Sequence, residues 1–368
     1  MNATPEKPIH DWNFIYGLAL LPLIYWALFA GGIFSYIGVF MLLNDTVMDF
    51  IQGRDKRNYP QKMEARLSQE KYYRYFTYIQ VPLVYLFIAV CGYLFCQPDA
   101  TWFERIGLLL SCGLTSGAIG ITHAHELVHK NSKWERFLGG LLLSATWYAT
   151  FKVEHVRGHH VTVSTPADQS SARLGQSLYH FLPRAVIGNV RNGFKLEAER
   201  LNRKGLNAWH WENELIWWTL LSLSYTLLFA VLFGVTGALF FVAQATIGFT
   251  LLEMINYVEH YGLERALLPN GKYERVTPKH SWNASEKASN YLLINLQRHS
   301  DHHAFPKRRY QILRHFDDSP QLPTGYPGMI LLTLIPPLWR AIMDPRAQDY
   351  MDALRQLREE ELSQTAAG

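Results

Sequence analysis

The sequence predicts an all-α integral membrane protein with six transmembrane helices and a cytoplasmic helical cap that holds a histidine-rich metal site. Three observations support this fold class. Six apolar runs each approach the roughly 20 residues that a helix needs to cross a bilayer. Hydrophobic residues make up 49% of the 368 residues and charged residues only 18%, which is little charge for a soluble protein. Histidines gather in four short motifs outside the apolar runs or at their ends.

The apolar runs define the expected transmembrane helices. They lie at about residues 14–30, 33–50, 75–95, 103–121, 215–233 and 237–257. The segments 51–74, 122–214 and 258–368 then lie on one side of the membrane, within a single domain of residues 1–368. By the positive-inside rule this side is cytoplasmic, because the loop after the second run is rich in basic residues: Arg54, Lys56, Arg57, Lys62, Arg66, Lys71 and Arg74.

Two further apolar segments are not expected to cross the membrane. A crossing at 137–151 would separate two histidine motifs, so we expect a helix that lies in the interface or packs against the metal site. The segment 329–339 is interpreted in the same way, since its Pro-Pro pair would break a spanning helix. Residues 164–206 indicate loops and a basic amphipathic helix, and 344–368 an exposed polar helix that frays into a tail.

The composition excludes several kinds of function. A net charge of +4 without a basic stripe argues against nucleic-acid binding. Three cysteines inside apolar runs form neither a disulfide framework nor a zinc ribbon: Cys91, Cys96 and Cys112. The chain also has no flavin, nicotinamide, haem or Cys₄ iron motif. A redox reaction at this chain therefore needs electrons from a separate protein.

The histidine motifs carry the chemistry. They are HAHELVHK at 123–130, EHVRGHH at 154–160, NYVEHYGL at 256–263 and LQRHSDHHA at 296–304. An α-helix turns once per 3.6 residues, so histidines three or four positions apart share a face. Imidazole is the commonest metal ligand, and these imidazoles exceed the four protein ligands that one zinc takes. The motifs therefore indicate two metal ions.

The remaining histidines are not expected to bind metal. His123 points to the face of its helix opposite His125, which places it outside the ligand set. Five others are far from the motifs and are expected at interfaces or on the surface: His10, His180, His210, His280 and His315.

Residues 125–129 also form an HExxH sequence, the motif of zinc metalloproteases, in which Glu126 would be the general base. A membrane zinc protease is therefore an alternative interpretation. It accounts for two histidines and leaves seven without a role.

In this order, HELVHK, EHVRGHH, NYVEHYGL and LQRHSDHHA resemble the histidine motifs of the membrane-bound alkane 1-monooxygenases. That non-haem di-iron family is related more distantly to membrane fatty-acid desaturases and hydroxylases, and the resemblance covers essentially the whole chain. It implies a di-iron site, and the choice of iron over zinc rests on it. The implied ligands of the two iron ions are His125, His129, His155, His159, His160, His260, His299, His302 and His303.

The resemblance also implies the reaction. Medium-chain n-alkanes would be hydroxylated at a terminal methyl group to 1-alkanols, with O₂ and two electrons from reduced rubredoxin, itself served by a rubredoxin reductase. The expected location is a bacterial inner (plasma) membrane, crossed several times, with the active site facing the cytoplasm. A membrane fatty-acyl hydroxylase or desaturase remains the alternative within oxidative chemistry.

Further residues are expected to support this site. Carboxylates beside the ligands are candidates to hydrogen-bond imidazoles and fix the rings: Glu126, Glu154, Glu259 and Asp301. Candidates for the wall of an alkane channel are Val39, Phe40, Leu42 and Leu43. Basic candidates for docking an acidic rubredoxin are Arg184, Arg191, Lys195, Lys307, Arg308 and Arg309. Asp45 and Asp49 are expected to anchor their helix by pairing with Arg54 or Lys56.

Overall fold

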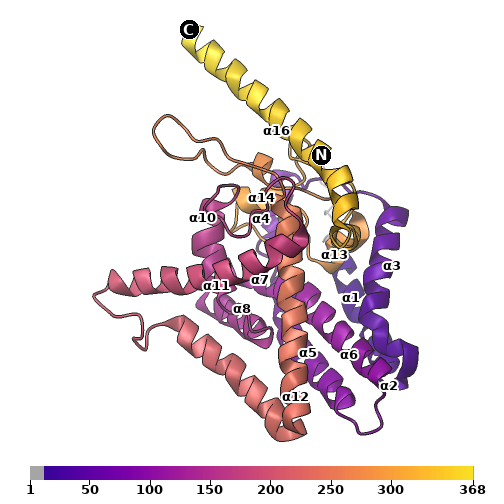
Figure 1. The fold of residues 1–368 in the computed structure, drawn as a ribbon. Helices are drawn as coiled ribbons and strands as arrows, with labels where there is room; N and C mark the ends of the chain where they lie inside the picture. The colour runs from indigo at the N-terminus through magenta and orange to yellow at the C-terminus, as the bar shows by residue number, and fades with distance from the viewer. Residues whose placement is uncertain (1–11, 368) are drawn as a thin grey trace, which may run out of the picture.

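The computed structural model describes residues 12–367, and helices form the regular structure of this part of the chain, beside three isolated β-bridges. Five helical stretches are long and apolar enough to cross a membrane: Asn13–Ala30, Gly32–Gln52, Lys71–Phe95, Trp102–Val128 and Glu214–His260. In Figure 1 they form the lower body of the molecule, and the short helices α7 and α14 lie toward its upper end. The all-helical, apolar architecture predicted from the sequence is confirmed.

The first third of the chain supplies four of these stretches. Its helices are η1 (Trp12–Ile15), α1 (Tyr16–Ala19), α2 (Leu21–Ala30), η2 (Gly32–Tyr36), α3 (Ile37–Gln52), α4 (Gln61–Leu67), α5 (Lys71–Phe95) and α6 (Trp102–Thr115). Helix α6 starts at a capping box in which the Thr101 side chain accepts from the Glu104 amide and Glu104 accepts from the Thr101 amide.

The fourth stretch continues past the predicted end at residue 121. After α6, the chain forms a π-helical segment, η3 (Ser116–Ile121), and then α7 (Thr122–Val128) without interruption. Single π turns inside α-helices occur often at functional sites. Here α6, η3 and α7 form one continuous helix, which places His125 beyond the end of the apolar run.

The segment between the fourth and fifth stretches folds back against this helix. Its elements are α8 (Lys133–Ala145), α9 (Phe151–Glu154), η4 (a π-helix, His155–His159), α10 (His160–Thr162) and α11 (Leu178–Asn202). Helix α8 has only 13 residues and packs on α7, which agrees with the prediction that 137–151 does not cross. The expected basic helix within 164–206 is α11.

Helix α12 (Glu214–His260) contains a sharp reversal at Gly234, where φ is 66°. The ring of Phe229 lies 6.1 Å from that of Phe240 and 5.1 Å from that of Phe241. Eleven residues of straight helix would separate them by about 16 Å, so the chain turns back on itself. Glycine adopts this positive φ without the steric cost of a side chain. Figure 1 shows the two arms of α12 meeting at the bottom of the molecule.

The last third covers the upper end of the body. Its helices are η5 (Pro278–His280), α13 (Lys287–Leu292), α14 (His299–Ala304), η6 (Tyr310–Ile312), α15 (Tyr326–Thr333) and α16 (Pro336–Ala367). The expectation of one helix over 329–339 is wrong, because α15 ends at Thr333 and the Pro-Pro pair begins α16. Proline is favoured at the first turn of a helix, where its missing amide is not needed.

The expected pairing of Asp45 or Asp49 with Arg54 or Lys56 is also wrong. Asp49 is buried and accepts hydrogen bonds from the amide and hydroxyl of Ser289, at 2.8 and 2.6 Å. Arg54 pairs instead with Glu286, and Lys56 with Asp317. Asp49 therefore fastens α3 to α13, whose backbone and hydroxyl donors satisfy the carboxylate without an ion pair.

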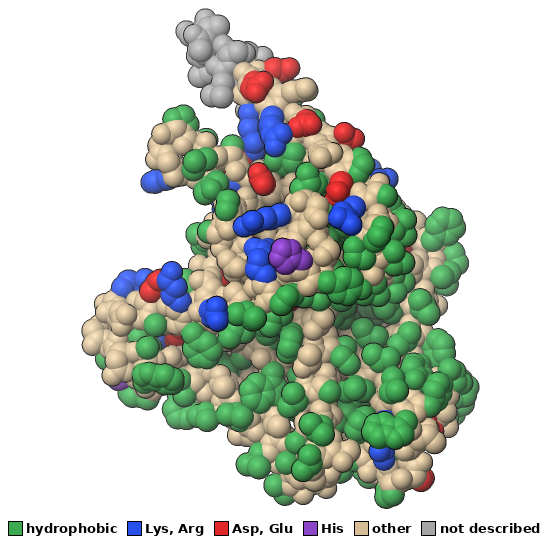
Figure 2. Space-filling model, viewed as in Figure 1, with side chains coloured by type: hydrophobic (Ala, Val, Ile, Leu, Met, Phe, Trp, Pro, Cys, Tyr) green, Lys and Arg blue, Asp and Glu red, His purple; other side chains and the backbone are tan. Residues whose placement is uncertain are grey.

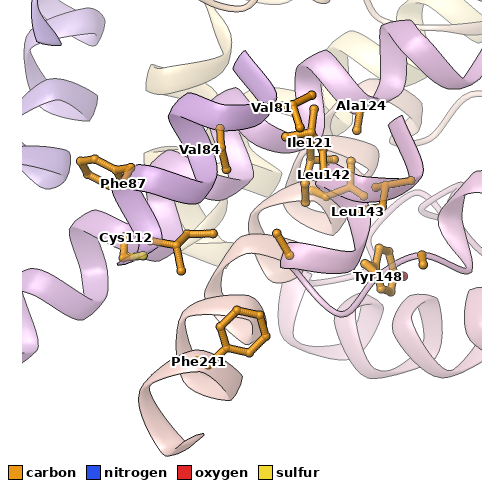
Figure 3. Packing of buried hydrophobic residues seen from close by; sticks show 14 of the residues in the cluster. Val81, Val84, Phe87, Cys112, Ile121, Ala124, Leu142, Leu143, Tyr148 and Phe241 are labelled. Atoms are coloured by element: carbon orange, nitrogen blue, oxygen red, sulfur yellow. The ribbon is translucent and has the colours of Figure 1, made fainter. Parts of the chain in front are cut away.

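Apolar side chains both fill and cover the helical body. Figure 3 shows Val81 of α5 close to Ile121 of η3 and to Leu142 and Leu143 of α8, with Val84 to one side, all within one buried apolar cluster. On the face in Figure 2, hydrophobic side chains spread over the lower part, and most charged side chains lie above them or at its lowest edge. An apolar exterior of this kind suits a lipid environment.

Candidate metal centre

Nine histidine side chains from four parts of the chain converge at the upper end of the helical body. They form two groups, and the candidate ligand atoms within each group all lie within 4.8 Å of one another. The first group is His125, His129, His155, His160 and His302, and the second is His159, His260, His299 and His303. Eight of these residues are buried and His160 is partly buried. These are the nine histidines named from the sequence, and their role as metal ligands remains a prediction.

In the first group, ring nitrogens point toward a common centre. Nε2 of His160 lies 3.1 Å from Nε2 of His155 and 3.1 Å from Nε2 of His302. Nε2 of His125 and of His129 are buried without a hydrogen-bond partner among residues 12–367. Buried polar atoms are nearly always paired, so five converging imidazoles, two of them with an unpaired Nε2, fit a bound cation.

The second group has the same character. Nε2 of His303 lies 3.3 Å from Nε2 of His159 and 2.9 Å from Nε2 of His299. Nε2 of His260 is buried without a partner in the described part of the chain. His159 and His160 are adjacent in sequence but belong to different groups, so the two groups lie side by side.

The local backbone explains how one short motif serves both groups. Residues His155–His159 form a π-helix followed by α10, and the wider π turn changes the angular spacing expected of an α-helix. A Cβ at Gly158 would lie 2.6 Å from Oε1 of Glu154 and 2.7 Å from Nδ2 of Asn192, so a larger residue here would displace these two side chains. The absent side chain lets α11 pack directly against the ligand-bearing turn.

Burial favours the neutral form of most of these imidazoles, as metal binding requires, whereas Asp168 raises the pKa of His159. Burial lowers the pKa well below the ordinary histidine value for His129, His155, His160, His299, His302 and His303. A neutral imidazole offers a lone pair on one ring nitrogen. The donor set therefore fits two divalent transition-metal ions, and imidazole suits iron as well as zinc.

The four carboxylates proposed from the sequence differ in what they contact. Oε2 of Glu259 lies 3.1 Å from Nε2 of His299, and the hydroxyl of Tyr326 donates to Oε1 of Glu259 at 2.6 Å. Glu126 forms an ion pair with Lys130 at 2.8 Å. Of these two, only Glu259 contacts an imidazole of the site.

The other two carboxylates brace the surrounding structure. Asp301 accepts two hydrogen bonds from Arg308, at 2.5 and 2.6 Å, and one from the Arg314 amide at 2.9 Å. Glu154 accepts from Asn192 at 3.1 Å, and burial raises the pKa of Glu154 to about 7. Neither has a hydrogen bond to an imidazole among the described residues.

Asp168 was missed from the sequence. It is buried, and Oδ2 lies 3.0 Å from Nδ1 of His159 and 2.6 Å from the donating hydroxyl of Ser171. A carboxylate on Nδ1 fixes the ring so that Nε2 faces the metal position. Helical spacing gives no sign of this contact, because Asp168 lies in the loop between α10 and α11.

The histidines outside the motifs lie outside both groups. His180 is exposed, His210 is partly exposed, and His280 and His315 are buried in hydrogen bonds with Glu274 and Asp317. His10 lies outside the described residues. His123 is separate from both groups, as the sequence predicts, and it lines a cavity instead.

Three cavities lie near α7, and two of them touch ligand candidates of the centre. The first has a volume of about 120 Å³ and an almost entirely apolar lining from α2, α3, α5, α6, α12 and neighbouring segments. A second, of about 10 Å³, touches His125, His155 and His299. Ile255 lines both. The third, of about 320 Å³, is polar and reaches His129 beside Lys130, Lys307 and Arg309.

The structure supports some of the channel-wall and docking candidates and not others. Of the four wall candidates, Leu42 lines the apolar cavity, and the other three are absent from its lining. Among the basic candidates, Arg308 pairs with Asp301 and Arg309 with Glu135, and Arg184 donates to the Ser171 carbonyl. The exposed members of the set are Arg191, Lys195 and Lys307.

Comparison with known proteins relates the whole site to one family. Residues 100–333 match the family model described as fatty acid desaturase. Two alkane 1-monooxygenases of Pseudomonas aeruginosa are 54% and 52% identical to this chain, each over 83% of it and 81% and 80% of their own lengths. Alkane 1-monooxygenase 2 of Alcanivorax borkumensis is 46% identical over 89% of this chain and 84% of its own length.

Proposed function

The chain belongs to the fatty acid desaturase family and, within it, to the alkane 1-monooxygenases, and from this premise we propose that it hydroxylates medium-chain n-alkanes at the terminal methyl group. The reaction consumes one alkane, one O₂, two electrons and two protons, and yields one 1-alkanol and one water. The family assignment disfavours the zinc-protease interpretation of residues 125–129.

We assign the two imidazole groups to two iron ions. His125, His129, His155, His160 and His302 would hold one ion, and His159, His260, His299 and His303 the other. Iron supplies the redox chemistry for oxygen activation, which zinc lacks. The protein's own contribution is to bury and orient the imidazoles, with Asp168 on His159 and Glu259 beside His299.

Position selects the terminal methyl group. Methyl C–H bonds are stronger than the methylene bonds beside them, so reactivity alone would favour attack within the chain. The apolar cavity would hold the alkane, and the small pocket at His125, His155 and His299 admits little beyond the chain end. Holding the reacting carbon in one place supplies the regiochemistry and part of the rate.

The observation that carries this proposal is a small pocket at His125, His155 and His299 that shares the lining residue Ile255 with the larger apolar cavity. The test is product analysis after supplying n-octane, O₂, a rubredoxin and its reductase to the purified, iron-loaded chain. We expect 1-octanol, with no product when rubredoxin or O₂ is omitted. If only an acyl substrate is oxidised or desaturated, the assignment to alkanes is wrong and the fatty-acyl alternative takes its place.

Electrons would come from rubredoxin docked over the polar cavity at His129. This polar cavity is lined by the ligand candidate His129, and its lining also carries the exposed cation of Lys307. Complementary charge accelerates docking mainly through the association rate. Lys307→Glu should raise the KM for rubredoxin several-fold, whereas Lys195→Glu on α11 should not. Equal effects of both changes would argue against this docking surface.

The chain would cross a bacterial inner membrane six times, since the reversal at Gly234 divides α12 into two arms. The metal centre then faces the cytoplasm, on the side of the basic loop after α3. A single cysteine introduced at Val235 in a cysteine-free background should react with an impermeant thiol reagent from the periplasm, and one at Lys272 should not. The opposite pattern would invert the topology.

A further inference from the structure

His123 lines the apolar cavity and carries a ring nitrogen without a partner among residues 12–367. Its Nδ1 lies 2.8 Å from the carbonyl oxygen of Ile119, and since a carbonyl only accepts, Nδ1 must carry the proton. Nε2 is then left with a lone pair. It is buried without a hydrogen-bond partner in residues 12–367, and His123 lines the cavity. A buried acceptor in this state is unfavourable unless a ligand donates to it.

Gln80 supplies complementary groups on the same wall. The rings of His123 and Phe76 are 5.7 Å apart, and Gln80 lies one helical turn beyond Phe76 on α5. Phe76, Gln80 and His123 all line the cavity, and Gln80 is buried. An amide both donates and accepts, so the two side chains together can satisfy a group that donates one hydrogen bond and accepts another.

An alkane offers neither bond, but the hydroxyl of a primary alcohol offers both. We infer that His123 and Gln80 form a binding site for the alcohol product, with the O–H donating to Nε2 of His123 and the oxygen accepting from the Gln80 amide. This inference rests on the proposed function, which makes a 1-alkanol the product. The apolar remainder of the cavity takes the alkyl chain.

The site lies on the far side of α7 from the metal centre. Residues two apart on a helix differ by about 200°, so His123 faces the cavity while His125 faces the imidazole groups. A hydroxyl bound at His123 has therefore left the small pocket at the metals. The product is held away from the reacting position, and a chain of equal length without a hydroxyl binds more weakly.

Equilibrium binding without turnover tests this inference. Radiolabelled 1-octanol would be bound to the purified, iron-loaded full chain in nanodiscs without rubredoxin, and n-nonane, with the same number of heavy atoms, would be the competing ligand. Two variants remove the hydrogen-bonding groups: His123→Phe, which keeps a ring against Phe76, and Gln80→Leu, which is remote from the ligands in sequence. Met41→Leu, at another lining residue, is the matched control because it conserves volume.

We expect 1-octanol to bind the unmodified chain more tightly than n-nonane does. Each of the first two variants should raise the Kd for 1-octanol by about 5- to 15-fold and leave that for n-nonane unchanged, and Met41→Leu should change neither. Equal affinity of the unmodified chain for both ligands, as when water alone occupies the site, would overturn the inference. So would parallel losses for both ligands in the Gln80 variant.

The iron content of each variant serves as the check on folding. Because the measurement involves no turnover, it stands even if n-octane yields no alcohol in the product analysis. A failure of the alcohol site and a failure of the proposed reaction are therefore distinguishable.

Discussion

The metal centre and the apolar cavity lie on opposite faces of α7 and place different demands on the sequence. The centre consists of nine imidazoles with specific partners, such as Asp168 on His159. The cavity lining is almost entirely aliphatic and aromatic side chains with few polar atoms. Function at the centre depends on which atoms are present, and function at the cavity on how much space remains.

The largest effect should come from removing an imidazole. His155→Ala deletes a ligand candidate of the first group, and we expect activity to fall by at least about 100-fold, since even partners of ligands are worth 10- to 100-fold, and iron content to fall from two ions per chain toward one. Product analysis and metal analysis measure the two quantities. His180→Ala, at an exposed histidine of α11, is the control. A variant at His155 that retains both properties would contradict the assignment of the centre.

A smaller effect is expected from Asp168, which hydrogen-bonds a ligand candidate but is not one itself. Asp168→Asn keeps the shape of the side chain but replaces a carboxylate oxygen at Nδ1 of His159 by an amide group. Iron affinity should fall by about 10- to 100-fold, measured by competition with a chelator. An unchanged affinity would mean that Asp168 does not orient the His159 ring, and that the imidazoles alone determine iron affinity.

This comparison also explains what could be predicted from the sequence. The four motifs and the family resemblance identify the nine histidines that converge, because the ligand candidates lie in or at the ends of helical segments whose residues are close in sequence. Asp168 could not be found, since a loop brings it to His159 and no periodicity describes a loop. The pairing of Asp49 with Ser289 was missed for a similar reason: the partners lie 240 positions apart.

The reversal at Gly234 could be predicted, because a glycine lies between two apolar runs. The division of 329–339 into α15 and α16 could not, because it depends on where the proline pair begins a helix. Of the cavity wall, only Leu42 was found. The sequence shows that α3 is apolar, but which side of it faces the cavity is decided by its packing against α6, α13 and α15.

Where the cavity holds the alkyl chain, away from His123 and Gln80, it should respond to the volume of the lining side chains. Leu42→Trp adds bulk to the lining and should lower the maximum alkane length accepted, with a rate loss of about tenfold or more for the longest substrates and little change for the shortest. Leu42→Met conserves volume and should leave the profile unchanged. Product analysis across a series of n-alkanes measures this. A uniform loss over all lengths would mean that Leu42 affects the centre instead of the cavity.

The smallest effect should come from a carboxylate that resembles Asp168 in everything except its neighbours. Asp49 and Asp168 are each 2% exposed, but Asp49 binds the amide and hydroxyl of Ser289 and orients no imidazole. Asp49→Asn should lower the free energy of unfolding by about 1–2 kcal/mol, because one charge-assisted hydrogen bond is weakened. Thermal inactivation in detergent would detect this as a modest shift, with iron affinity unchanged. If Asp49→Asn lowered iron affinity as Asp168→Asn should, a buried carboxylate would affect iron binding without contacting an imidazole. That result would contradict the assignment of iron affinity to the contacts of the metal centre alone.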